Sequence, residues 1–117
     1  MKSVILSNIK VEEIIAGEVV EKEIFVLRDF VYPVIKSAPQ HCQDITFEEQ
    51  VLLASILNKL MVCFKTKATS VLLENEEHRI FLKVLKACKM IILEPELTTY
   101  ISGLAELKDI EVVAADV

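Results

Sequence analysis

Glycine is scarce in this chain of 117 residues, which contains two glycines and three prolines. A loop that wraps a phosphate group with its backbone N–H groups needs several glycines, because a side chain would block the close approach of the backbone. Gly17 and Gly103 are far apart in the sequence. The sequence therefore excludes a glycine-rich nucleotide-binding loop.

Positive charge is also in short supply, with 13 Lys and Arg residues against 18 Asp and Glu residues and a net charge of −5. Nucleic-acid backbones and anionic lipid surfaces attract positively charged protein surfaces. We therefore expect neither nucleic acid nor membrane as a partner. The longest apolar segment, residues 46–64, is too short and too charged at its ends for a membrane span, and Lys59 lies inside it.

The cysteines are few and widely spaced. Cys42, Cys63 and Cys88 are odd in number and form no Cys-x-x-Cys pair, a pattern that favours reduced thiols in a cytoplasmic protein. The apolar start of the chain reaches polar residues at Ser7 and Asn8, too early for a signal peptide. We expect a cytoplasmic protein.

Hydrophobic residues make up 53% of the chain and charged residues 26%. Such a composition can bury enough apolar surface to offset the entropy lost on folding, so the sequence predicts one folded domain over residues 1–117. The apolar share is slightly above that of an ordinary soluble domain. This excess indicates apolar surface that is kept for a partner.

The segment 46–64 is predicted to be the central helix. Thr46 and Glu49 have the spacing of a capping box, in which each side chain accepts from the other residue's backbone N–H. Beyond the first turn the helix is apolar on nearly every side. We therefore expect the rest of the molecule, or a second copy of it, to surround this helix.

The segment 10–32 can be interpreted in two ways. Apolar residues at helical spacing favour a helix, while the β-branched residues and Gly17 favour a hairpin. Helix is our choice, and Pro33 is expected to kink or end it before a loop at 37–44.

The remaining segments complete a mainly α prediction: a bundle of three to four helices around the central helix. An α+β fold is possible if short terminal strands pair. The expected segments are a strand or arm at 4–6, an apolar piece at 71–73, a helix at 76–89 capped by Asn75, a helix end or strand at 90–93, a helix from Pro95 to Leu107, and a tail at 110–114 that could pair with 4–6.

Two sequence similarities are interpreted as chance or as ordinary helix chemistry. Residues 14–21 resemble a segment of the MutL-type mismatch-repair ATPases, but the metal-binding Asn that follows in that family has no counterpart in Leu27–Phe30. Residues 48–57 also align without a gap with residues 76–85, acid pair on acid pair. Duplication would produce this match, but any two amphipathic helices with acidic first turns produce it as well.

Few residues are candidates for metal binding or catalysis. Imidazole and thiolate are the ligands that zinc prefers, and the residues of these types are His41, Cys42, Cys63, His78 and Cys88. None is spaced from another as ligands on one helix face would be, so we expect neither metal nor cofactor. Adjacent residues of an extended segment point apart, which disfavours His41 and Cys42 as a catalytic pair. Lys83, Lys86 and Lys89 line one helix side, which faces solvent or an acidic partner.

The sequence leaves three functional hypotheses. The first is a non-enzymatic protein–protein interaction or regulatory module, which acts by self-association, as a homodimer, or by covering an apolar groove of a partner. The second is a small phage or mobile-element accessory protein that inhibits a host protein; residues 72–77 and 109–113 resemble small tailed-phage proteins in general style. The third, placed last, is a small enzyme that uses His41, Cys42 or His78.

Overall fold

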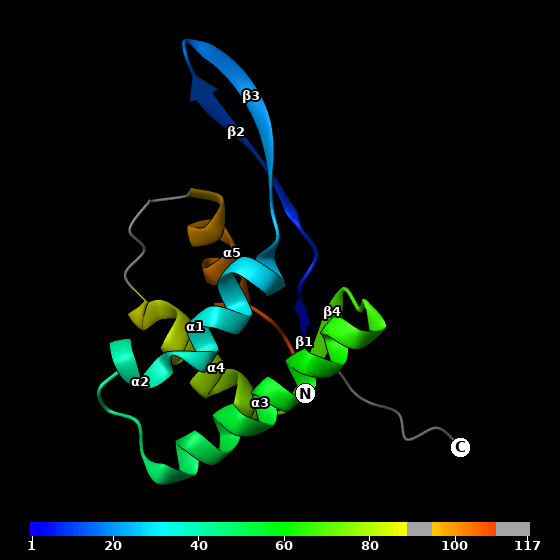
Figure 1. Ribbon diagram of the computed structural model, residues 1–117. Coiled ribbons are helices and arrows are strands. Elements are labelled where there is room, and N and C mark those ends of the chain that lie inside the picture. The colour runs from blue at the N-terminus through cyan, green and yellow to red at the C-terminus, as the bar shows by residue number, and fades with distance from the viewer. Residues whose placement is uncertain (89–94, 110–117) are drawn as a thin grey trace.

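The structure is a computed structural model that describes residues 1–88 and 95–109 (Figure 1). The elements in chain order are β1 (Lys2–Ile5), β2 (Ile9–Ile15), β3 (Glu18–Ile24), a π-helical segment η1 (Val26–Val31), α1 (Tyr32–Lys36), α2 (Ala38–His41), α3 (Phe47–Thr66), β4 (Ser70–Leu73), α4 (Asn75–Ala87) and α5 (Pro95–Ala105).

The fold is α+β. Helices share the described residues with two antiparallel two-stranded sheets, β1–β4 and β2–β3. The expectation of a mainly α bundle is therefore wrong, because strands make up the N-terminal part of the chain and one further strand lies between α3 and α4.

The largest correction concerns residues 10–32, where the predicted helix is a hairpin followed by η1 and α1. Seven residue pairs join β2 to β3, from Ile9 opposite Ile24 to Ile15 opposite Glu18. The turn is the two-residue loop Ala16–Gly17, with φ values of 54° and 81°. Positive φ at both positions matches the right-handed twist of the flanking strands. Pro33 lies in the first turn of α1, directly after η1 ends at Val31.

This hairpin projects from the helical body, and we call residues 9–24 the hairpin arm (Figure 1). The molecule is correspondingly elongated, with principal extents of 54 × 37 × 27 Å. An isolated two-stranded hairpin is only marginally stable in water. At the base of the arm, Val11 is buried and Ile9 packs against the core.

The N-terminal strand pairs with β4. Lys2 lies opposite Leu73 and Ile5 opposite Ser70, while the tail 110–114 and the segment 90–93 lie outside the described residues. Because strand side chains alternate between faces, Val71 and Leu73 are buried while Leu72 is exposed.

The capping box of α3 is confirmed. The backbone N–H of Glu49 donates to Thr46 Oγ1, and the backbone N–H of Thr46 donates to Glu49 Oε1, both at 3.1 Å. The helix ends at Thr66, and its C-cap residue Lys67 has a left-handed backbone with a φ of 56°. The expectation that the rest of the molecule surrounds α3 is wrong. Its inner side is buried against α1, α4 and β4, whereas large apolar side chains on its outer side are exposed.

The other helices differ from the prediction mainly at their ends. The predicted loop 37–44 contains the short helix α2. Glu74, and not Asn75, is the N-cap of α4. The predicted helix after Pro95 is present as α5, which ends at Ala105.

One cluster of buried residues spans the body of the molecule. It reaches from Val4 in β1 to Leu104 in α5, and its largest fully buried side chain is Phe81 of α4. Two hydrogen bonds hold α5 and the chain after it to β1: Tyr100 Oη donates to the carbonyl of Ile5 at 2.6 Å, and Lys2 Nζ donates to the carbonyl of Leu107 at 3.0 Å.

The turn of the arm gives a direct test of this fold. Left-handed backbone costs an L-residue such as Ala16 about 1 kcal/mol, and asparagine tolerates it better. We expect Ala16→Asn to slow amide hydrogen exchange in the arm roughly fivefold and Gly17→Val to accelerate it. Unchanged exchange in both variants would contradict the turn geometry.

Candidate functional site

The cysteine and histidine residues are distributed over several places. Cys42 and Cys63 are buried in the core, and Cys63 Sγ donates to the carbonyl of Ser70 at 3.7 Å. The ring Nε2 of the buried His78 is 2.8 Å from the carbonyl of Leu104, which joins α4 to α5. These residues therefore have packing and hydrogen-bonding roles.

His41 and Cys88 line the same small pocket of about 340 Å³. The pKa of the Cys88 thiol is raised by burial, which disfavours the thiolate that a nucleophile needs. His78 lines a different pocket, so His41 and His78 do not face a common space. Across residues 1–88 and 95–109, no three His, Cys, Asp or Glu side chains group in a way that could hold a metal ion.

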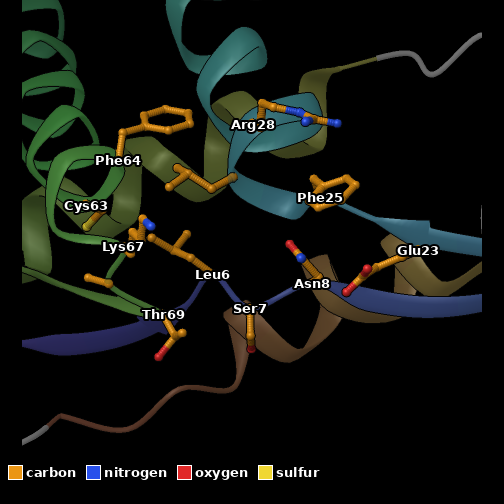
Figure 2. Close-up of a pocket in the computed structure, with 12 residues that line it drawn as sticks. Leu6, Ser7, Asn8, Glu23, Phe25, Arg28, Cys63, Phe64, Lys67 and Thr69 are labelled. Carbon is orange, nitrogen blue, oxygen red and sulfur yellow. The ribbon is translucent and has the colours of Figure 1, made fainter.

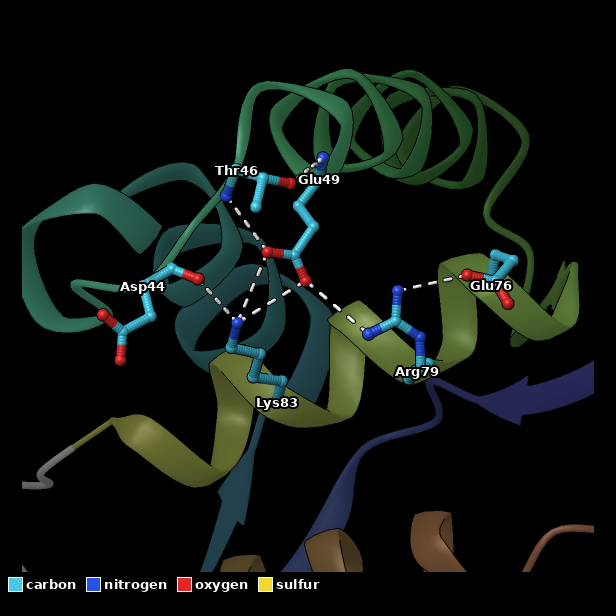
Figure 3. A network of polar contacts seen from close by, with 6 residues as sticks. All are labelled: Asp44, Thr46, Glu49, Glu76, Arg79 and Lys83. Atoms are coloured by element: carbon cyan, nitrogen blue, oxygen red, sulfur yellow. Dashed lines mark hydrogen bonds and ion pairs between the residues drawn. The ribbon is translucent and has the colours of Figure 1, made fainter.

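The buried carboxylates of Glu49 and Glu77 join α3 to α4. Figure 3 shows the contacts of Glu49. Glu49 of α3 accepts from Lys83 Nζ at 3.4 Å and lies 3.6 Å from a guanidinium nitrogen of Arg79, both on α4. Lys83 also donates to the carbonyl of Asp44 at 2.7 Å. The residue that caps α3 is thus also an ion-pair partner of α4.

Glu77 of α4 makes the reciprocal connection to α3. It accepts from Ser55 Oγ at 2.8 Å and from Lys59 Nζ, and also from the backbone N–H of Glu74 at 3.0 Å. Each carboxylate therefore binds the start of its own helix and a cation of the other helix.

Both carboxylates ionise more readily than ordinary glutamates. The pKa of Glu49 is lowered, first by the hydrogen bond from the Thr46 backbone and then by Lys83 and Arg79. Burial acts to raise the pKa of Glu77, but the hydrogen bonds from Lys59, Glu74 and Ser55 outweigh it and the pKa is lowered. A carboxylate held in the ionised form is a poor general acid, and the contacts of Glu49 and Glu77 with Lys83 and Lys59 connect the two helices.

The tip of the hairpin arm presents the first large apolar surface. Ile14 is 75% exposed and Val19, directly opposite it, is 64% exposed; Ile15 and Val20 are exposed as well. Strand alternation places Ile14 and Val19 on one face of the arm and Ile15 and Val20 on the other. Both faces of the tip therefore carry exposed apolar side chains, and on the second face Glu18 and Glu13 lie opposite Ile15 and Val20.

Below the tip, the face that carries Ile14 and Val19 is acidic. Glu12 lies directly opposite Glu21, and Lys10 lies opposite Glu23. Like charges directly across a pair of strands destabilise it. This face has three carboxylates and one ammonium group, so a cationic surface would relieve the repulsion.

A groove of about 680 Å³ lies where the arm joins the body (Figure 2). Its apolar lining includes Leu6, Phe25 and Phe64, and Glu23 of the arm also lines it. Arg28 at the edge of the groove lies over the Phe25 ring, 4.2 Å from its centroid, and pairs with Asp29. The groove is therefore lined by residues of both the arm and the body and connects their surfaces.

The outer side of α3 presents the second large apolar surface. Phe47 is 74% exposed and Val51 54% exposed, and Met61 and Val62 extend the surface towards the end of the helix. Sequence reasoning identified this helix but not which of its sides stays uncovered. Sequence reasoning did not identify the tip of the arm as a surface. The pattern that could have indicated it is Ala16–Gly17, a two-residue turn between segments rich in β-branched residues.

No family model matches the chain, and searches of curated proteins and of solved structures also find no match. None of the helices in the described parts of the chain is both long and apolar enough to cross a membrane.

Removal of the Glu77 carboxylate tests the connection between α3 and α4. Glu77→Gln leaves Lys59 without its ion-pair partner, and we expect the free energy of unfolding to fall by about 2 kcal/mol. The matched control is the neighbouring Glu76→Gln, because Glu76 is exposed and pairs with Arg79 across one turn of the same helix. Equal loss of stability in both variants, measured by urea unfolding, would contradict the role of Glu77.

Acid should weaken the same connection. Since the pKa values of Glu49 and Glu77 are lower in the folded state than the ordinary value of 4.5, their contribution is fully present above about pH 4.5 and is lost as the pH falls through the folded-state values. We expect the melting temperature to drop below pH 4.5, and to drop less steeply in Glu77→Gln than in Glu76→Gln. Parallel pH curves for the two variants would contradict this assignment.

Proposed function

We propose that this protein is a non-enzymatic protein-interaction module that binds a partner protein with its hairpin arm. The single observation that carries the proposal is the apolar tip of the arm, where Ile14 and Val19 are largely exposed at the end of a projecting hairpin. Exposed apolar surface of this kind is typical of protein-binding sites.

The chemistry of the arm specifies the partner. Side chains of the tip require an apolar pocket, and the acidic face around Glu12 and Glu21 requires positive charge at the pocket's edge. We therefore propose a partner protein with an apolar groove and a basic rim. The net charge of −5 supports a protein in preference to nucleic acid or an anionic membrane.

The cytoplasm is the proposed compartment, supported by the three free cysteines Cys42, Cys63 and Cys88. A host-inhibiting accessory protein of a phage or mobile element would use the same arm and differ in the identity of its partner. That alternative stays a prediction.

Site-specific photo-crosslinking tests the arm proposal. A photo-reactive residue at position 14 should form a discrete adduct with one protein in extract of the source cells, and excess unmodified protein should compete for it. The matched control carries the same residue at position 51 of α3, which is also apolar and exposed. Loss of one apolar anchor costs an interface about 1 kcal/mol or more, so Val19→Glu should weaken binding of the identified partner at least fivefold. Formation of the same partner adduct as readily from position 51 as from position 14, or an adduct that Val19→Glu leaves unchanged, would contradict the proposal.

A further inference from the structure

The exposed residues on the outer side of α3 form a regular stripe. We define the α3 stripe as six exposed positions: Phe47, Val51, Ala54, Asn58, Met61 and Lys65. Successive members are separated by four, three, four, three and four residues. This is the spacing of the contact positions of a coiled coil, which lie along one side of a helix. The stripe therefore has the geometry of a helix-pairing surface.

The order of these spacings is the same from either end, and its centre is at Ile56. In an antiparallel pair of two copies, Phe47 would face Lys65 of the second copy and Val51 would face Met61. The central layers would bring the small Ala54 against Asn58. Each layer then occurs twice, as a two-fold symmetric interface requires.

Charge favours the antiparallel arrangement over the parallel one. A parallel pair would place Lys65 against its own counterpart and align the two helix dipoles. An antiparallel pair opposes the dipoles and brings Glu48 near Lys65 of the second copy. It also lets the Lys65 ammonium group lie over the Phe47 ring, a favourable cation–π contact.

We propose that two copies of this protein associate through antiparallel pairing of their α3 stripes. At 1.5 Å per residue the helix is about 30 Å long, and the exposed Val62 and Leu72, which border a neighbouring groove, widen the contact. A contact one helix long is small, and small specific contacts are typically transient. We therefore expect a dimer that forms and dissociates with protein concentration.

The pairing is independent of the arm. The stripe residues are exposed, and α3 itself lies away from the tip of the arm (Figure 1). A dimer formed through α3 leaves both arms free, and a bivalent molecule binds a multivalent partner more tightly than one arm does. The inference thus goes beyond the proposed function and does not depend on it.

Light scattering on purified protein at increasing concentration tests the association. The wild type is expected to shift from the monomer mass to the dimer mass. Val51→Glu places a charge in the stripe and should raise the dissociation constant at least tenfold, while Val19→Glu at the arm tip should leave it unchanged. Both positions are exposed, so both variants should keep the wild-type circular dichroism spectrum.

Disulfide trapping tests the orientation. Val51→Cys and Met61→Cys are each made in a Cys88→Ser background, because Cys88 is partly exposed and could itself be oxidised. Cys42 and Cys63 are buried and can stay. Antiparallel pairing predicts that oxidation links the two variants to each other when they are mixed, and that Val51→Cys alone links poorly.

Four results would contradict the proposed pairing or its orientation. A monomer at every concentration overturns the inference, and so does a dimer that Val51→Glu leaves intact. Efficient linking of Val51→Cys to itself overturns the antiparallel orientation. A dimer that only Val19→Glu disrupts would assign self-association to the arm and would overturn the pairing through α3.

Discussion

The structure depends on the reciprocal attachment of α3 and α4 by two buried carboxylates. Glu49 caps α3 and pairs with Lys83 of α4, while Glu77 accepts at the start of α4 and pairs with Lys59 of α3. A buried charge is costly unless it is paired and hydrogen-bonded, so the helix starts and the contact between the two helices stabilise each other. This attachment fixes which side of α3 faces inward and therefore which side is left outside.

The two exposed apolar surfaces follow from that arrangement. With its inner side against α1, α4 and β4, α3 carries Phe47 and Val51 on the opposite side. The hairpin arm leaves the body at Ile9 and returns at Ile24, and only its base is buried. The body thus keeps its core intact while the arm and the outer side of α3 retain apolar groups for other molecules.

Sequence reasoning succeeded where the signal is local. The capping box of Thr46 and Glu49 lies within four residues, and it located α3. It failed for residues 10–32, because Ile15 and Val19 have the four-residue spacing of a helix face, whereas in the hairpin Val19 lies opposite Ile14 and Ile15 lies opposite Glu18. Pairing of β1 with β4, and of Lys59 with Glu77, joins distant residues that no local pattern specifies. Which side of α3 stays exposed depends on those distant contacts as well.

The central claim is that these apolar surfaces contact other protein molecules, and methyl NMR spectra recorded over a dilution series test it most directly. The account predicts that the Val51 and Met61 methyl signals move with protein concentration, because the α3 stripes pair, while those of Ile14 and Val19 stay fixed until a partner protein is added. Signals of Val51 and Met61 that stay fixed from micromolar to millimolar concentration would contradict the account.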